Sequence, residues 1–294
     1  MNLHDVKKLL YKIKPIAFLL DIRDRKINQR LRKIELKKKE KWDANFLDNN
    51  KIQYKISERV NINLYKDSVL SRLIFEGNFE LDEINFVKNT LKKGDVFIDI
   101  GANIGLFSLI GAEIVGNEGK VICYEPSPNT FNRLKENIVL NQFTNIVHNN
   151  IGISDKKSVL KLNISENGHD AWDTFANNVD STTYQKTADI NVNTLDDEIS
   201  ELDIKKIKLI KIDVEGWEKF VLLGAKNVLN NFSPILLVEF TQANTQAAGY
   251  NVLEIYDIMT NLGYKWYRYK NNKLVIEKKQ KTYLYDNLIA IKDK

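Results

Sequence analysis

The sequence predicts an α/β fold built on a doubly wound, mostly parallel sheet of seven strands. From position 96 onward, short apolar runs alternate with stretches of helical periodicity, which is typical of consecutive βαβ units. The run 96–107 has the pattern of a buried strand, a glycine turn and the start of a helix. A second apolar strand, 121–124, leads to Glu125, twenty-four residues past Gly101. That spacing is typical of a doubly wound fold that binds a nucleoside.

The expected elements follow in a regular order. Strands are predicted at 96–100, 121–125, 145–149, 207–212, 235–239, 264–269 and 286–291, and helices at 105–115, 128–141, 216–230 and 251–262. Ahead of them, the pattern indicates a small hairpin at 52–56 and 60–65 and a helix at 81–91.

One region breaks this rhythm. Residues 158–164 and 189–193 are predicted as additional strands. The polar stretch between them, 165–188, is rich in Asn, Asp and Thr, and a loop of that length in a compact domain is usually functional or disordered.

The basic character of the chain is concentrated in an N-terminal arm. Residues 1–42 contain fourteen Lys and Arg against five Asp and Glu, a balance of +9, while the whole chain carries +5. The remainder is therefore mildly acidic, which argues against a nucleic-acid platform. We predict a basic helical arm at 1–50 and one domain at 51–294. Apolar residues recur in the arm at roughly helical spacing: Ile16, Leu20, Ile27, Leu31 and Ile34.

Three partners are open for this arm: the protein body or a second copy of the chain, a membrane surface, and a nucleic acid. Docking or self-association is the favoured interpretation, ahead of peripheral membrane contact, and nucleic acid is the least favoured.

Cysteine content and hydropathy point to a reducing compartment. The one cysteine, Cys123, lies in an apolar strand and is expected to be a core residue. One cysteine and three histidines make a structural zinc site an unfavoured interpretation. The longest apolar stretch near the N-terminus, 16–20, is too short to span a bilayer. We expect a cytoplasmic protein, with the inner face of the membrane as an alternative site for the arm.

In an open parallel sheet, ligands bind beyond the carboxyl ends of the strands. Most of the predicted strand ends carry a carboxylate or an amide: Asp99, Glu125, Asn149, Asn150, Asp213, Glu215 and Glu239. Asp99 can either contact a ligand or order the glycine turn. Glu125 is expected to bind ribose hydroxyls.

The spacing of the glycines indicates which kind of nucleoside ligand the turn binds. A dinucleotide fingerprint needs glycines at 101, 103 and 106, but these positions hold Gly101, Asn103 and Leu106. The turn has Gly101 and Gly105 instead, which suits close approach of a compact ligand without a pyrophosphate. S-adenosylmethionine (SAM) fits this description, with its methionine carboxylate on the amides of the helix start.

A second candidate segment is Lys211-Ile-Asp-Val-Glu-Gly-Trp-Glu218, where an apolar strand delivers Asp213 to the edge of the sheet. Asp213 and Glu215 would point to one side if the strand continued through them. Alternatively, Glu215 and Glu218 complement the positive N-terminus of the next helix.

Four ordered motifs together resemble the FkbM family of SAM-dependent methyltransferases. They are Asp99-Ile-Gly-Ala-Asn-Ile-Gly105, Tyr124-Glu-Pro-Ser-Pro128, Leu195-Asp-Asp197 and Lys211-Ile-Asp-Val-Glu-Gly216, and the resemblance covers roughly residues 80–291. It implies a Rossmann-like class I methyltransferase fold, in which a seven-stranded sheet has an antiparallel last strand. The arm lies outside the resemblance.

The resemblance also implies roles for single residues. Gly101, Asn103 and Gly105 would line the methionine end of SAM, Glu125 would bind the ribose, and Asp213 would lie at the reaction centre. Residues at the same strand ends complete the expected cofactor site: Asp99, Pro126 and Asn150.

The function that follows is O-methylation of a hydroxyl, with a small molecule or glycan as acceptor; the sugar class comes from the resemblance alone. A hydroxyl needs a base, for which the candidates are Asp213, Glu239 and His169. His169 lies near Trp172, and an aromatic face can stack on a sugar. A divalent cation on Asp213, Glu215 and Glu239 is an alternative route that we do not favour.

Two other functions stay open at this stage. One is methylation of a nitrogen or a carboxylate; methylation of a nucleic-acid base is disfavoured because the chain lacks an Asn/Asp-Pro-Pro-aromatic run after the second anchor strand. The other is a non-catalytic assembly protein that binds SAM without turnover.

Overall fold

The computed structural model describes residues 14–46, 49–165, 172–177 and 184–293. The chain separates into two compact units, residues 1–52 and 53–294. The first unit contains α2 (Lys14–Asp43), a single helix of 30 residues in which Pro15 stands in the first turn, where proline is tolerated. The partners predicted for the arm stay predictions. In the described part of the chain, no helix combines the length and the apolar character that a membrane span requires.

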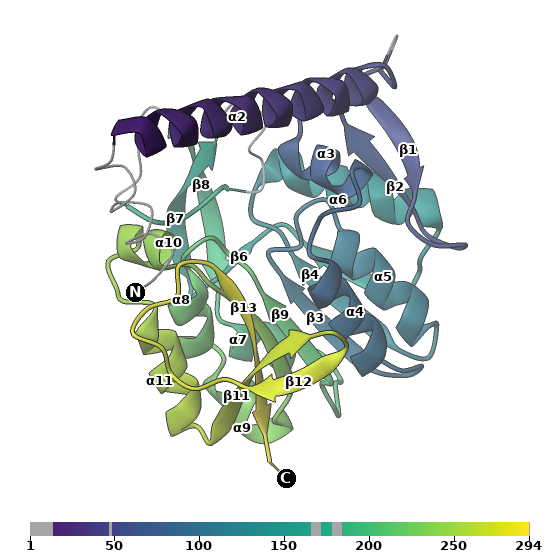
Figure 1. The fold of residues 1–294 in the computed structure, drawn as a ribbon. Coiled ribbons are helices and arrows are strands. Elements are labelled where there is room, and N and C mark those ends of the chain that lie inside the picture. The colour runs from purple at the N-terminus through teal and green to yellow at the C-terminus, as the bar shows by residue number, and fades with distance from the viewer. Residues whose placement is uncertain (1–13, 47–48, 166–171, 178–183, 294) are drawn as a thin grey trace. The chain divides into compact units, whose positions relative to one another are not determined.

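The second unit is organised around one large sheet. Its strand order is β12-β11-β13-β10-β9-β3-β4-β5 (Figure 1). The strands are β3 (Val96–Ile100), β4 (Lys120–Tyr124), β5 (Ile146–Asn149), β9 (Leu209–Ile212), β10 (Ile235–Phe240), β11 (Tyr264–Lys270), β12 (Lys273–Ile276) and β13 (Asp286–Lys292). All seven predicted strands are present in it, so the predicted α/β architecture is confirmed.

An eighth strand, β12, was not predicted. It pairs with β11 in an antiparallel hairpin, and both residues of the connecting turn, Asn271 and Asn272, have positive φ. Asparagine tolerates this conformation, which two-residue hairpin turns require. The strand was missed because all four of its side chains are exposed, which leaves no buried face to produce alternation.

The sheet is mostly parallel, as expected. β3 pairs in parallel with β4 and with β9, and β9 pairs in parallel with β10. The last strand, β13, lies between β10 and β11 and is antiparallel to both. The chain runs outward from β3 through β4 to β5 and then returns to β9 on the other side of β3. This reversal of strand order opens a crevice at the carboxyl ends of β3 and β9.

Helices cover both faces of this sheet (Figure 1). One face carries α4 (Leu81–Thr90) and α5 (Leu106–Val115), with α6 (Pro128–Asn141) following β4; the other carries α9 (Lys226–Phe232) and α11 (Leu253–Asn261). Strand residues between the two layers, such as Ile98, Ile122, Ile210 and Val238, are fully buried. Cys123 is also buried and free, in agreement with a core role.

The helix predicted at 216–230 is two helices, α8 (Glu218–Leu223) and α9. The break falls at Gly224, where an added Cβ would lie 2.0 Å from the backbone oxygen of Ser154. The chain therefore needs glycine where this turn packs against the segment after β6. The remaining short helices are α3 (Val69–Phe75), α7 (Leu195–Ser200) and α10 (Gln242–Ala247).

Two smaller sheets accompany the large one. β1 (Lys51–Lys55) and β2 (Asn61–Tyr65) form the predicted hairpin, and β6 (Gly152–Ile153), β8 (Tyr184–Asn193) and β7 (Ser158–Ser165) form a three-stranded sheet in that order. β8 begins five residues earlier than predicted. The loop predicted at 165–188 is shortened accordingly, and its residue Thr174 pairs with Asn163 of β7.

Candidate active site

A cavity of about 540 Å³ lies at the carboxyl ends of β3, β4, β9 and β10. This volume is within the range of small-molecule sites, roughly 300–1,000 Å³. Among the predicted site residues, the structure brings together around it Gly101, Asn103, Glu125, Pro126, Trp172, Asp213, Glu215 and Glu239. Asp99, Gly105 and Asn150 are not part of the lining.

Every backbone amide of the glycine turn is engaged within the protein. The amides of Gly101 and Ala102 donate to the carbonyl of Tyr124, and that of Gly105 donates to Ala102. The amide of Asn103 donates to the Glu125 carboxylate, and that of Ile104 to the Asn103 side chain. All five amides of the turn 101–105 are therefore hydrogen-bonded within the protein, and the placement of the methionine carboxylate on the amides of the helix start stays a prediction. The first helical residues, Leu106 and Phe107, also line the cavity.

The two glycines of this turn are required by packing. Gly101 has φ +80°, and an added Cβ would lie 1.8 Å from the carbonyl oxygen of Asp213. Gly105 has φ +95°, and a Cβ there would lie 2.6 Å from the side chain of Leu134. The glycine at 101 thus lets the β3 turn pack against the end of β9, and this contact brings the two halves of the site together.

Glu125 is the acidic residue at the end of β4. Its two carboxylate oxygens accept the backbone amides of Ser127 at 2.9 Å and Asn103 at 2.8 Å. Burial raises the pKa of Glu125 to about 8, and the two amides act in the opposite direction. Each oxygen retains one further lone pair, so the fixed carboxylate can still accept two hydroxyl donors from the cavity.

Asp99 and Asn150 support the site from behind. Asp99 is fully buried and its carboxylate accepts the Ser108 hydroxyl at 2.6 Å, which ties β3 to α5. Asn150 donates its amide to the carbonyls of Glu125 and Pro126 at 2.8 and 3.1 Å. Asp99 contacts α5 and does not line the cavity, and both interpretations of its role stay predictions.

Across the cavity, Asp213 follows the last residue of β9. Its carboxylate forms a 2.7 Å ion pair with Lys211, whose side chain is 6% exposed. The ammonium also lies 4.8 Å from the centre of the Phe107 ring. Burial by itself lowers the pKa of Lys211, but the charges of Asp213, Asp99 and Glu80 outweigh it and raise this pKa overall. Lys211 is therefore a fixed positive charge beneath the site.

Glu215 reaches the same space by a turn. β9 ends at Ile212, and Glu215 has φ +50°, a conformation that is uncommon for a residue with a side chain. Its carboxylate accepts the amide of Asn244 at 2.6 Å. At Gly216, an added Cβ would lie 2.5 Å from the Asn244 carbonyl, so glycine permits this approach. Asp213 and Glu215 do converge, but through the turn and not through a continued strand.

For Glu215 and Glu218, the alternative to a role in the site was a structural role beside the next helix. Glu218 has a structural role of this kind. It is buried, and one of its carboxylate oxygens accepts the amides of Val214 and Gly216. The other accepts the Tyr250 hydroxyl at 3.2 Å. Glu218 therefore holds the turn that carries Glu215, whereas Glu215 faces the cavity.

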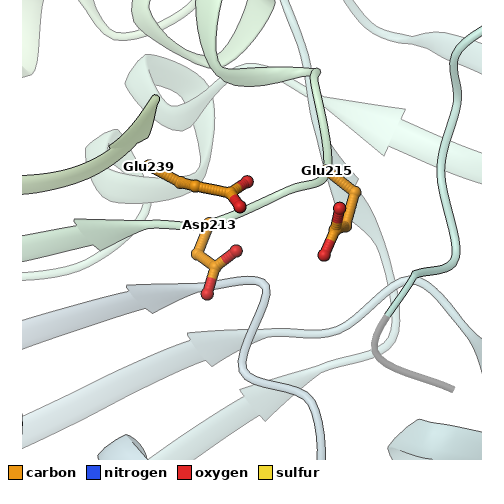
Figure 2. Close-up of side chains that lie close together, drawn as sticks. All are labelled: Asp213, Glu215 and Glu239. Carbon is orange, nitrogen blue, oxygen red and sulfur yellow. The ribbon is translucent and has the colours of Figure 1, made fainter. Parts of the chain in front are cut away.

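Glu239, at the end of β10, completes an acidic cluster, which we define as Asp213, Glu215 and Glu239. One carboxylate oxygen from each lies within 4.8 Å of the others. Figure 2 shows the three side chains directed toward a common space from two neighbouring strand ends. Burial and the charges of Glu215 and Asp213 raise the pKa of Glu239 well above its usual value.

Comparison with known protein families shows to which family this chain belongs. The family model of the methyltransferase FkbM domain matches residues 99–266, more than half of the chain. The chain belongs to the FkbM methyltransferase family. The resemblance that the four motifs indicated is thereby confirmed.

The sequence identity to individual relatives is low. The chain is 26% identical to the hexuronic acid methyltransferase AglP of Haloferax volcanii over 54% of its length and 61% of the relative's. It is 28% identical to the 31-O-demethyl-FK506 methyltransferase FkbM of Streptomyces tacrolimicus over 47% of its length and 62% of the relative's. The matched region thus spans about three fifths of these curated relatives.

Among solved structures, the crystal structure of the methyltransferase FkbM from Methylobacillus flagellatus KT aligns with a TM-score of 0.43 and 15% identity. The alignment covers 67% of this chain and 43% of that one. The fold assignment depends on the strand order of this chain itself.

Two charged residues that line this cavity, Lys211 and Glu80, were not predicted as site residues from the sequence. Lys211 lies in an otherwise apolar strand and lines the cavity; a lysine at a buried strand position signals a carboxylate partner. Glu80 precedes α4 with φ +42° and also lines the cavity. Burial, together with the Asp213 charge, raises its pKa to about 8. Only its place before a helix was visible in the sequence, which gave no sign of this contact.

The long polar loop is described in part. His169, one of the three candidate bases, lies outside the described residues. Trp172 is exposed at the cavity, and Thr174 donates its hydroxyl to the Glu215 carbonyl at 2.6 Å. The described piece of the loop is thus attached to the turn that carries the acidic cluster.

Proposed function

We propose that this chain transfers a methyl group from SAM to a hydroxyl of a small-molecule or glycan acceptor. The observation that carries this proposal is a single cavity with two unlike ends. One end holds the fixed carboxylate of Glu125 beside the glycine turn, and the other holds the acidic cluster. Such a cavity can bind a nucleoside at one end and an ionisable acceptor at the other.

The residues at the Glu125 end fit the nucleoside part of SAM. The Glu125 carboxylate is oriented by two amides and keeps two lone pairs for ribose hydroxyls. Because the amides of the glycine turn are engaged, we assign the methionine carboxylate to the N-terminal end of α5, whose residues Leu106 and Phe107 line the cavity.

When bound, SAM supplies a methyl group on a positively charged sulfur, already activated for attack. The contribution of the protein is to align an acceptor oxygen with the methyl–sulfur axis and to take up its proton. The oxygen–carbon bond forms as the carbon–sulfur bond breaks, and the sulfur keeps the electron pair as a neutral thioether. Within the described residues, Asp213 and Glu239 are the candidate proton acceptors. Glu239 has the free oxygen that this role needs.

A sugar hydroxyl is the acceptor class that we favour. The name of one relative refers to a hexuronic acid, which is a sugar derivative, and that of another refers to methylation at an oxygen of FK506. In this chain, the exposed ring of Trp172 at the cavity offers an apolar surface on which the face of a sugar can pack.

An acceptor screen with methyl-labelled SAM tests this proposal. Uronic acids, neutral sugars, simple amines and small carboxylic acids would be offered separately, and label in each product would be located by mass spectrometry. Label on a sugar oxygen supports the proposal. Label on nitrogen or on a carboxylate alone would assign the chain to another class of methyltransferase, and SAM binding without transfer to any acceptor would favour an assembly protein.

The affinity for SAM is expected to rise with pH through the ionisation of Glu125. Ribose hydroxyls donate to the carboxylate, so binding favours the ionised form, and a pKa of about 8 leaves most of this residue protonated at neutral pH. The affinity should increase roughly tenfold between pH 7 and pH 9. Calorimetric titration of SAM at several pH values measures this change, and Glu125→Gln should remove it.

The stability of the ligand-free protein should respond in the opposite direction. The pKa of Glu125 in the folded protein lies above the ordinary value of 4.5, so its contribution to stability is complete below about pH 4.5 and is lost as the pH rises through about 8. A SAM affinity that is flat in the wild type, or equally pH-dependent in Glu125→Gln, would contradict the ribose role.

A further inference from the structure

The acidic cluster has the composition and spacing of a cation site. It contributes one carboxylate oxygen each from Asp213, Glu215 and Glu239, all within 4.8 Å of one another (Figure 2). Asp213 and Glu215 follow β9, and Glu239 ends the neighbouring strand β10. All three line the cavity, so an ion bound between them would also face the bound substrate.

A second, independent observation concerns one oxygen of Glu239. This residue is 6% exposed, and its Oε1 accepts the Thr241 hydroxyl at 3.0 Å, but its Oε2 has no hydrogen-bond partner. The side chain is directed toward the space between Asp213 and Glu215 (Figure 2). A buried carboxylate oxygen without a partner is costly, so this oxygen points to a ligand in that space.

The charges of the cluster are not balanced by the protein. Lys211 neutralises Asp213 at 2.7 Å. Among the residues that the structure describes, no Lys or Arg forms an ion pair with Glu215 or Glu239. A bound dication would supply the positive charge that these two carboxylates lack.

We propose that Asp213, Glu215 and Glu239 bind one divalent cation of the hard, oxygen-preferring class, such as Mg²⁺ or Mn²⁺. The donor set is made of carboxylates alone and contains neither His nor Cys, which suits these ions rather than Zn²⁺. All three donor residues line the cavity. This inference rests on the proposed function, in which the charge of the cation lies where the acceptor hydroxyl must lose its proton.

Binding of Mn²⁺ to the whole chain, without SAM or acceptor, tests the site. The signal of free Mn²⁺ in electron paramagnetic resonance falls as the ion binds, so a titration gives the number of sites and their affinity. We expect one site in the wild type. Glu239→Gln and Glu215→Gln should each weaken it by about tenfold or more, while the surface variant Glu118→Gln should bind as the wild type does.

Circular dichroism and SAM affinity report whether each variant is folded. The proposal is overturned if the wild type binds no Mn²⁺ up to about 1 mM, the weakest range in which proteins use such ions. It is also overturned if both glutamine variants, folded, keep the wild-type affinity. Failure of methyl transfer alone would bear on the proposed function and leave the cation site standing.

A separate experiment tests the role of the cation in catalysis. If the ion acts on the acceptor, removal by a chelator should abolish methyl transfer without loss of SAM affinity, and added Mg²⁺ should restore transfer. Full activity after removal would contradict the catalytic role.

Discussion

Replacing Gly101 with alanine should lower the free energy of unfolding by about 3–5 kcal/mol, an effect at the upper end for a single substitution. Two costs combine: a side chain at φ +80° strains the backbone, and the new Cβ would lie 1.8 Å from the Asp213 carbonyl. The contact is with backbone, so no side-chain rotation relieves it. Denaturant unfolding followed by circular dichroism measures the change.

Gly94 provides a matched control for this substitution. Its φ is +83°, almost the same as that of Gly101, but an added Cβ would have no neighbour within 4 Å. Gly94→Ala should therefore cost only the backbone strain, about 1–2 kcal/mol. Equal losses in the two variants would show that the contact between the glycine turn and β9 is not what makes glycine necessary at 101.

Glu239→Gln should lower the turnover of methyl transfer by about a hundredfold or more while leaving the fold intact. The amide cannot accept the acceptor's proton, and it is a weaker cation ligand than a carboxylate, so turnover falls whichever role Glu239 has. The loss should appear in kcat, with SAM affinity retained, because Glu239 lies at the end of the cavity opposite Glu125.

The same substitution should leave stability unchanged or raise it by about 1 kcal/mol. The amide oxygen can still accept the Thr241 hydroxyl, no bond to Oε2 is lost, and the new NH₂ faces two carboxylates. Glu118→Gln on the surface should change neither property. Wild-type turnover in Glu239→Gln would remove Glu239 from the reaction centre.

Sequence reasoning was most reliable where burial is complete. Strands such as β3 and β9 are apolar apart from Asp99 and Lys211, because both faces of a parallel sheet are covered, so their positions and the carboxylates at their ends could be predicted. β12 could not be found in this way, because its exposed side chains follow no pattern. The split between α8 and α9 depends on one contact of Gly224 with Ser154, which are seventy residues apart in the chain.

Prediction of the site from the sequence has the same limit. The spacing of Gly101 and Glu125 predicted a nucleoside pocket, but it could not show that the turn's amides are already engaged. That result depends on where Tyr124 and the Glu125 carboxylate lie in three dimensions. Likewise, the unpartnered oxygen of Glu239 has no sequence signature, since it depends on which neighbouring groups reach it.

Calorimetric titration of SAM and of its demethylated product, S-adenosylhomocysteine, into the whole chain tests the proposed SAM site most directly. We expect one equivalent of each to bind, and Glu125→Ala to weaken both by about 1–3 kcal/mol, the cost of the lost hydrogen bonds to the ribose. If neither compound binds to the folded wild type, the cavity is not a SAM site and the proposed methyl transfer is wrong.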